Sequence, residues 1–276
     1  MPVVHVDGAD LHYEDDDFTD PWRPRETVVL LAHLSGDSDE YRAWVPTLAR
    51  HYRVIRPDRR GLGRSTAPPL GYTYTLDTLA NDTLALLDAL GLEKVHLVGT
   101  SGGGIMAIHF AAHHPARVRS LTGVGTPAFV PAKAQGRFLR DGYPDGISAL
   151  MAMGTWLYAR TAAPLYTSRI PLQNELFMER MGRVPAHVLA GLMRMASTMD
   201  ITPLLPRIAA PTLLLYAEQG QFDVAEQQMM ARTIPACELH GIEAAGNITW
   251  DNPDECAKVV LRFLQRVTNG ETIGEA

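Results

Sequence analysis

The sequence has few cysteines and no excess of positive charge, and each absence excludes a class of protein. Cysteine occurs only at Cys237 and Cys256, and neither lies near a second cysteine or a histidine at the spacing of a metal site. We expect two buried free thiols and no bound metal. The formal net charge of −6 offers no positive field to the phosphate backbone of a nucleic acid, so nucleic acid is not an expected partner.

Long apolar runs and a cofactor-binding glycine motif are also absent. No stretch approaches the roughly 18 consecutive apolar residues of a membrane-spanning helix. The first residues, Met1 to Asp7, are not a basic segment followed by an apolar run, the pattern of a secretory signal. Gly61 and Gly63 lack the third glycine of a dinucleotide fingerprint. We therefore expect a cytoplasmic protein without a membrane partner and without a cofactor.

The chain alternates between buried strands and helices. Continuous apolar runs at Thr27–His33 and Val95–Gly99 are typical of strands covered on both faces. Glu40–Arg50, Leu76–Leu90 and Cys256–Val267 repeat apolar residues at helical spacing. This alternation predicts an α/β fold with a doubly wound, mostly parallel sheet. The other predicted strands form an N-terminal hairpin and four later runs, at residues 2–6, 9–13, 52–56, 120–123, 212–216 and 237–242.

One long segment interrupts this alternation. Residues 127–206 contain no strand-like run but several short helical patterns separated by prolines. The segment is too long for a loop, so we predict a helical cap at 127–206 over a core formed by 1–126 and 207–276. Seven of the 11 methionines lie in this cap, which suits a deformable apolar pocket wall. We place the side chains of Met153, Trp156 and Trp250 on that wall.

A strand, a tight turn and a helix meet at Gly99-Thr100-Ser101-Gly102-Gly103. This pentapeptide has the pattern G-x-S-x-G, in which glycines flank the serine because the turn is too sharp for side chains there. The turn raises the serine hydroxyl above the sheet at the N-terminus of a helix. The pattern predicts Ser101 as a catalytic residue.

With these flanks the sequence resembles the α/β-hydrolase superfamily. Arg56–Ser65 is similar to the family signature P-D-x-R-G-x-G-x-S, and Leu30–Gly36 resembles the segment that follows the family's third strand. His114–Val118 and Pro211–Leu215 also resemble family segments. The likeness is greatest to capped members such as enol-lactonases, haloperoxidase-like esterases and carbon–carbon hydrolases. The resemblance implies an eight-stranded, mostly parallel sheet with a helical cap.

The serine turn and the family resemblance together predict a site that binds a carbonyl oxygen. The backbone N–H of Gly102 is expected to point toward the Ser101 side. A second donor from Leu34 or Ser35 would complete an oxyanion hole, with Leu34 in place of the family's usual glycine. His33 in relatives holds this loop by hydrogen bonds, although a catalytic role for His33 is an alternative.

The resemblance fails at the two partners of the serine. Gly220 stands at the position of the family's catalytic acid, and Asn247 at that of its catalytic histidine. An alternative acid position near Gly125–Thr126 is not acidic either. Loss of the base lowers turnover of a serine triad by roughly 10⁶. His240, seven positions before Asn247, is the candidate for a relocated base.

Three hypotheses follow for the function. The first is a non-hydrolytic enzyme that performs a cyclisation, elimination, isomerisation or epimerisation on a small, largely apolar carbonyl compound, as in natural-product biosynthesis, with Ser101 and Asn247 as neutral hydrogen-bonding groups. An alternative is an ester, lactone or carbon–carbon hydrolase in which Ser101 uses a relocated or substrate-supplied base. A third is a small-molecule receptor or carrier without catalysis. The sequence does not indicate the oligomeric state.

Overall fold

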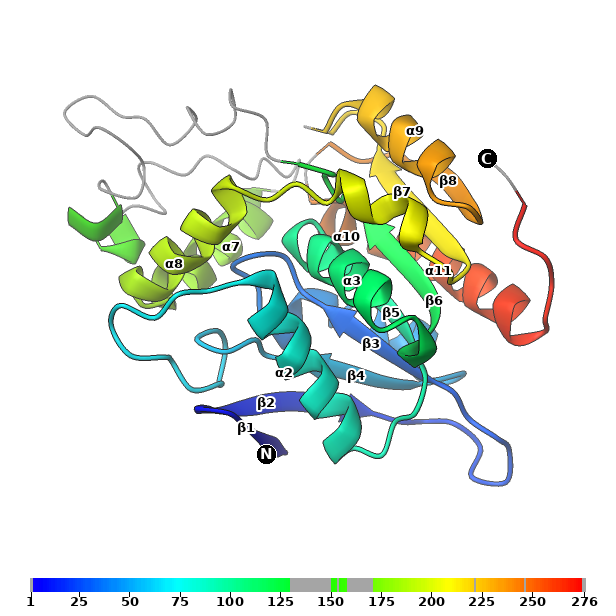
Figure 1. Cartoon of the computed structure of the whole chain (residues 1–276), viewed down its shortest axis with the longest axis horizontal. Helices are drawn as coiled ribbons and strands as arrows, with labels where there is room; N and C mark the ends of the chain where they lie inside the picture. Colours follow the sequence, from blue (N-terminus) through cyan, green and yellow to red (C-terminus); the bar gives the residue numbers. More distant parts are fainter. Residues whose placement is uncertain are drawn as a thin grey trace.

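One mixed sheet forms the centre of the molecule (Figure 1). The computed structural model describes residues 2–129, 150–152, 154–157, 171–220, 222–245 and 247–274. Eight strands follow the order β1-β2-β4-β3-β5-β6-β7-β8, in which β2 is antiparallel to both of its neighbours and the remaining pairs are parallel. The strands are β1 (Val3–Val6), β2 (Ala9–Asp16), β3 (Thr27–Leu31), β4 (Arg53–Pro57), β5 (Val95–Thr100), β6 (Val118–Val124), β7 (Thr212–Ala217) and β8 (Cys237–Ile242). The predicted eight-stranded, mostly parallel sheet is confirmed.

Helices cover both faces of the sheet. Helices α2 (Leu76–Ala89), α3 (Gly102–His113) and α9 (Val224–Thr233) lie on one face, and α1 (Val45–Leu48) and α11 (Pro253–Thr268) lie on the other. Each face of the sheet has its own hydrophobic core, and alternate residues of β3 belong to different cores. Val29 and Leu31 lie in one core, and Val28 and Leu30 lie in the other. The continuous apolar runs of the sequence therefore reflect burial on both faces.

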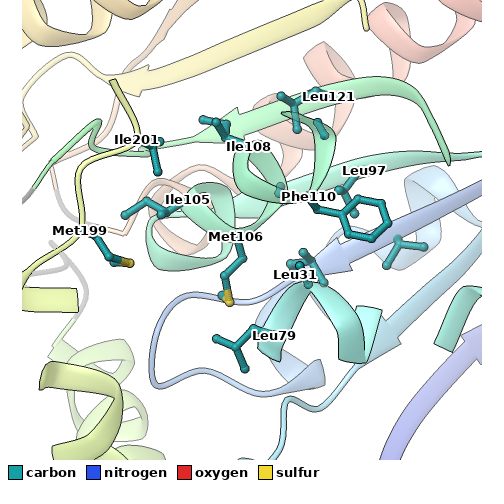
Figure 2. Packing of buried hydrophobic residues seen from close by; sticks show 14 of the residues in the cluster. Leu31, Leu79, Leu97, Ile105, Met106, Ile108, Phe110, Leu121, Met199 and Ile201 are labelled. Carbon is teal, nitrogen blue, oxygen red and sulfur yellow. The ribbon is translucent and has the colours of Figure 1, made fainter. Parts of the chain in front are cut away.

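Helix α3 is buried almost all round because it lies between the sheet, α2 and the segment that returns from the cap. Figure 2 shows Ile105 and Met106 of α3 in the same core cluster as Leu31 of the sheet, Leu79 of α2 and Met199. A helix that is apolar on every side requires such enclosure. This packing holds the N-terminus of α3, which follows Ser101, in a constant position against the sheet.

The described part of the cap segment is helical. Helices α7 (Pro171–Arg183) and α8 (Ala186–Ser197) lie beyond the carboxyl ends of the central strands, and η4 (Thr202–Arg207) leads back to the core (Figure 1). Phe129 forms an isolated antiparallel bridge with Asp200, so the chain leaves for the cap and returns from it at one place. The exact division into core and cap stays a prediction, and Met153 lies outside the described residues.

The segment expected as one helix over Glu40–Arg50 is instead two short helices. A 3-10 helix, η1 (Ser38–Tyr41), is followed by α1, with Pro46 in the first turn of α1. Proline has no N–H to donate to a carbonyl in the preceding turn, so a continuous helix cannot pass through this position. The interruption lets η1 turn its side chains inward, and Glu40 and Tyr41 are both buried. The remaining short helices are η2 (Pro115–Arg117) and α10 (Ile248–Asp251).

Candidate active site

Ser101 occupies a strained turn between β5 and α3. Its φ of 50° makes it the one non-glycine residue with positive φ in the described part of the chain. Side chains are excluded around it, because a Cβ on Gly99 would lie 2.3 Å from the carbonyl oxygen of Gly103 and a Cβ on Gly103 would lie 2.2 Å from that of Leu31. The local geometry is the one that the pattern G-x-S-x-G predicts.

Two backbone N–H groups without acceptors lie beside Ser101. A Cβ built on Gly102 would lie 3.1 Å from the backbone nitrogen of Leu34, so the two residues are in direct contact. In the described part of the chain, neither the Gly102 nor the Leu34 N–H has a hydrogen-bond acceptor. The N–H of Ser35, by contrast, donates to Nδ1 of His33 at 3.3 Å. Of the two donors left open by the sequence, the geometry favours Leu34.

A half-buried arginine holds the loop that carries Leu34. The guanidinium of Arg59 donates to the carbonyl oxygens of Ala32 at 2.8 Å and Leu34 at 2.7 Å. His33 is also buried, and burial together with the charges of Arg59 and Arg180 lowers the pKa of its imidazole to about 3. The ring is therefore neutral, and its Nδ1 already accepts a hydrogen bond. His33 supports the loop in this arrangement rather than acting as the base of Ser101.

Asn247 caps the short helix α10. Its Oδ1 accepts hydrogen bonds from the backbone N–H of Thr249 at 3.2 Å and from the Thr249 hydroxyl at 2.5 Å. Because the backbone N–H of Thr249 can only donate, the amide atom that it meets is the oxygen. Nδ2 is buried and has no acceptor in the described structure. A buried N–H without a partner costs about 1–3 kcal/mol, so a ligand oxygen here would be stabilised.

The N-terminus of α10, where Asn247 lies, is next to the serine turn. The backbone N–H of Ser101 donates to the carbonyl of Val124 at 2.9 Å, and the next residue, Gly125, contacts Ile248, whose methyl carbon lies 3.5 Å from the Cβ position of Gly125. Ser101 Oγ itself makes no hydrogen bond in the described part of the chain. The residue after Asn247 thus contacts the strand end beside the serine turn, and the side chains of Asn247 and Ser101 are not paired.

The sequence analysis missed Glu40, a buried carboxyl group between the oxyanion loop and α10. Its Oε2 accepts the backbone N–H of His33 at 2.7 Å, and its Oε1 lies 3.4 Å from the Thr249 hydroxyl. Burial raises the pKa of Glu40 to about 8, against the opposing effects of the His33 N–H and of the Arg59 charge. Glu40 is therefore neutral near pH 7. Its signal in the sequence is weak, because a glutamate in a helical pattern usually faces solvent.

Replacing Glu40 with glutamine is expected to stabilise the protein at neutral pH. The folded-state pKa of about 8 exceeds the ordinary value of 4.5, so the wild-type free energy of unfolding falls as the pH rises between these values. Glutamine does not ionise, and by pH 7 the variant should be more stable by about 3 kcal/mol. Urea unfolding at pH 5 and pH 7 measures the difference. An equal difference at both pH values would contradict this prediction.

Comparison with known proteins identifies the family of this chain. The model of the alpha/beta hydrolase fold matches residues 26–249, which include strands β3 to β8, the serine turn and Asn247. The chain belongs to the α/β-hydrolase fold family. This family of enzymes shares the eight-stranded sheet described above, so the resemblance stated from the motifs is confirmed at the level of the family.

Curated relatives of this α/β hydrolase include two named enzymes. The 2-hydroxy-6-oxononadienedioate/2-hydroxy-6-oxononatrienedioate hydrolase 1 of Dechloromonas aromatica is 29% identical over an alignment of 256 residues, which covers 87% of this chain and 86% of the relative once gaps are left out. The 3-oxoadipate enol-lactonase 1 of Acinetobacter baylyi is 24% identical over an alignment of 246 residues, and the coverage is 87% of this chain and 89% of the relative. The crystal structure of the enol-lactonase from Burkholderia xenovorans LB400 has a TM-score of 0.84 at 24% identity, covering 96% of this chain and all of that one.

In this α/β hydrolase, a side chain at Gly220 would be crowded. Gly220 ends a turn after β7 in which its N–H donates to the carbonyl of Ala217 at 3.1 Å. A Cβ on Gly220 would lie 2.7 Å from Cβ of Ala217 and 3.1 Å from its carbonyl oxygen. The turn in its present form does not accept the aspartate that the family pattern implies.

Replacing Gly220 with aspartate is therefore expected to destabilise the protein by about 1–2 kcal/mol, because the turn after β7 must shift to relieve the contact with Ala217. Thermal or urea unfolding measures the loss. Gly220→Ala is the matched control, since its Cβ makes the same contact without a charge, and it should show a similar loss. A neutral or stabilising effect of both substitutions would contradict the steric argument.

The structure does not bring His240 to the serine. His240 is exposed on the edge strand β8 and pairs in register with Leu215, which pairs with Val124, which pairs with Thr100. Three strand spacings separate His240 from the residue before Ser101, about 14 Å. An imidazole must lie within about 3 Å of the serine oxygen, directly or through one water, to accept its proton. A relocated base at His240 would need a different position of β8.

The pocket-wall residues have different surroundings. Trp250 donates from Nε1 to the carbonyl of Glu40 at 3.0 Å and lines a small cavity together with Phe177 and Arg180 of α7. Trp156 is 59% exposed and contacts Gly182 of α7. A cleft of about 350 Å³ runs along α7, and its described lining is largely charged: it includes Asp37, Asp39, Asp58, Arg64, Glu179, Arg180 and Arg183.

Two further findings concern metal and membrane binding. Over residues 2–129 and the later described ranges, no group of three or more histidine, cysteine or acidic side chains is arranged to hold a metal ion. In the same residues, no helix is both long enough and apolar enough to cross a bilayer.

Proposed function

We propose that the chain hydrolyses a small ester, a lactone or a carbon–carbon bond next to a carbonyl group. The observation that carries this proposal is that the backbone N–H groups of Gly102 and Leu34, two residues in contact with each other beside Ser101, have no acceptor in the described part of the chain. Such a pair stabilises the oxyanion that forms when a hydroxyl adds to a carbonyl, at about 10² to 10³ in rate per donor. The reported relatives are named as enzymes that hydrolyse carbonyl compounds, which supports hydrolysis over binding alone.

In this proposal the substrate supplies the missing base. The Ser101 oxygen bonds to the carbonyl carbon while its proton passes to a basic oxygen of the substrate, and the N–H groups of Leu34 and Gly102 bind the oxyanion. The bond to the leaving group then breaks as that group takes up a proton, and water releases the acyl group from Ser101. Nδ2 of Asn247 donates to a substrate oxygen. The names of the relatives' substrates, a hydroxy-oxo-dienedioate and an oxoadipate enol-lactone, describe compounds with carboxylate oxygens.

The proposal is tested with pairs of substrates that differ only in a basic group. Esters, enol-lactones and oxodienoates that carry a carboxylate are compared with the same compounds as neutral methyl esters. We expect turnover of at least one carboxylate-bearing compound and a rate at least 100-fold lower for its neutral partner. If no compound of any pair is hydrolysed, the proposal that the chain is a hydrolase is contradicted. If a carboxylate-bearing compound and its neutral methyl ester are hydrolysed at equal rates, the proposal that the substrate supplies the base is contradicted.

A non-hydrolytic reaction is the second candidate, and the surroundings of Ser101 favour it. Ser101 Oγ has no hydrogen-bonded base in the described part of the chain, and Asn247 stands where the family pattern has a histidine. A neutral site of this kind can stabilise an enolate without a covalent intermediate. Product analysis in ¹⁸O-labelled water separates the two candidates, because only hydrolysis places the label in the product acid.

A further inference from the structure

Three buried side chains form a line from η1 to the start of α10. Oε1 of Glu40 lies 3.4 Å from Oγ1 of Thr249, and the same Oγ1 lies 2.5 Å from Oδ1 of Asn247. Glu40 and Thr249 are almost fully enclosed, with 2% and 0% of their surface exposed. The line therefore connects the interior behind the oxyanion loop to the amide whose Nδ2 has no acceptor.

The number of available protons determines which group donates in each hydrogen bond of this line. Thr249 has one hydroxyl proton, and the amide oxygen of Asn247 can only accept, so the short 2.5 Å contact uses that proton. The contact between Thr249 and Glu40 is then a hydrogen bond only if the carboxyl group provides a proton of its own. An ionised Glu40 would instead compete with Asn247 for the single Thr249 proton, because a carboxylate is the stronger acceptor.

We propose that protonated Glu40 is a positioning residue that, through the Thr249 hydroxyl, orients the Asn247 amide with its NH₂ group toward the substrate, and that ionisation of Glu40 releases this orientation. That Nδ2 of Asn247 binds a substrate oxygen rests on the proposed function. The change in hydrogen bonding when Glu40 ionises does not depend on that function. Glu40 touches neither the substrate nor Ser101 in this mechanism, and it acts only through Thr249 and Asn247.

The other titratable groups that face Glu40 do not account for a change in hydrogen bonding with a midpoint near pH 8. From the oxyanion loop, burial lowers the pKa of His33 to about 3, and from the loop after β4, burial lowers that of Arg59 to about 10. Burial raises the pKa of Tyr41, next to Glu40, well above its usual value. Arg180 of α7 and Asp37 line the same small cavity, and burial also raises the pKa of Asp37. Asp37→Asn is therefore the control for a second carboxyl group.

The side-chain amide signals of Asn247 in nitrogen-15 NMR test the proposal without a substrate. Their assignment comes from a spectrum of Asn247→Ser. In the wild-type protein we expect the signals to shift between pH 6 and pH 9.5 with a midpoint near 8, the pKa to which burial raises Glu40. Glu40→Gln should hold the low-pH position throughout, because its NH₂ group donates to Thr249 as the protonated acid does. Thr249→Val should abolish the shift while keeping a similar shape, and Asp37→Asn should retain it.

No shift in the wild-type protein, or an unchanged shift in Glu40→Gln or Thr249→Val, would overturn the proposal. If a substrate is turned over, kcat/KM should fall about tenfold above pH 8, and Glu40→Gln should remove that fall. A purely structural role for Glu40 would lower activity at every pH and leave the profile unchanged. Absence of turnover with an intact NMR titration would count against the proposed function alone.

Discussion

Replacing Ser101 with alanine is expected to lower hydrolysis at least 100-fold. The proposed reaction requires the serine oxygen to bond to the carbonyl carbon, and no other hydroxyl occupies the strained position at φ 50° between β5 and α3. The N–H groups of Leu34 and Gly102 remain in the variant, so binding of the substrate should persist and KM should change little. Steady-state kinetics on the substrate found in the paired assay measures both constants.

Ser101→Gly is the matched control for the backbone. Glycine adopts a positive φ without strain, so this variant should be at least as stable as Ser101→Ala while lacking the same hydroxyl. Both variants should lose activity to a similar extent if the hydroxyl is the cause. Retention of most of the hydrolysis in both variants would show that Ser101 forms no covalent bond in the reaction and would contradict the proposed mechanism.

Replacing Asn247 with histidine is expected to raise hydrolysis of an activated neutral ester by about 10². The family pattern has an imidazole at this position. Ile248, the residue after Asn247, contacts Gly125, and Gly125 follows Val124, whose carbonyl accepts the N–H of Ser101. The gain should stay well below the roughly 10⁶ of a complete triad, because Gly220 provides no carboxylate to orient the ring. The rate should rise with pH through the ordinary imidazole pKa of about 6.5.

Asn247→Ser is the control for this gain. Serine can cap α10 as asparagine does, but it offers no proton acceptor, so its activity on the same ester should not rise. Histidine caps a helix less well, and Asn247→His should lose about 1 kcal/mol of stability. An equal rate in both variants would show that position 247 does not reach Ser101.

The strained serine turn was predictable because its sequence pattern is local, even though one of the oxygens that Gly103 must avoid belongs to Leu31 in β3. Gly99 and Gly103 must lack side chains to avoid backbone oxygens, and this need appears directly in five consecutive residues. The strands were predictable for a similar reason, since burial on both faces leaves an uninterrupted apolar run such as Thr27–Leu31.

Glu40 could not be predicted, because its burial depends on distant segments. Thr249 and Trp250 lie more than 200 positions away in the chain, and together with His33 they enclose the carboxyl group. The pattern of Glu40–Arg50 indicated one helix with apolar residues at helical spacing, and it assigned no role to Glu40. Only the break before α1 turns it inward.

The choice between two oxyanion donors also depended on tertiary contacts. Leu34 and Ser35 were equivalent in the sequence, and the imidazole of His33 decides between them by accepting the N–H of Ser35. His240 was the candidate for a relocated base because it lies seven positions before Asn247, but strand register places it three strands away.

The sequence by itself determined the family and the serine turn, because the motifs that carry them consist of residues that are adjacent in the chain. Tertiary structure alone decided which N–H groups are unpaired, that a carboxyl group is buried behind the oxyanion loop, and that Thr249 links it to Asn247. Hydrogen bonds and desolvation depend on distances between segments that are separated by more than two hundred residues, and a linear pattern does not contain those distances.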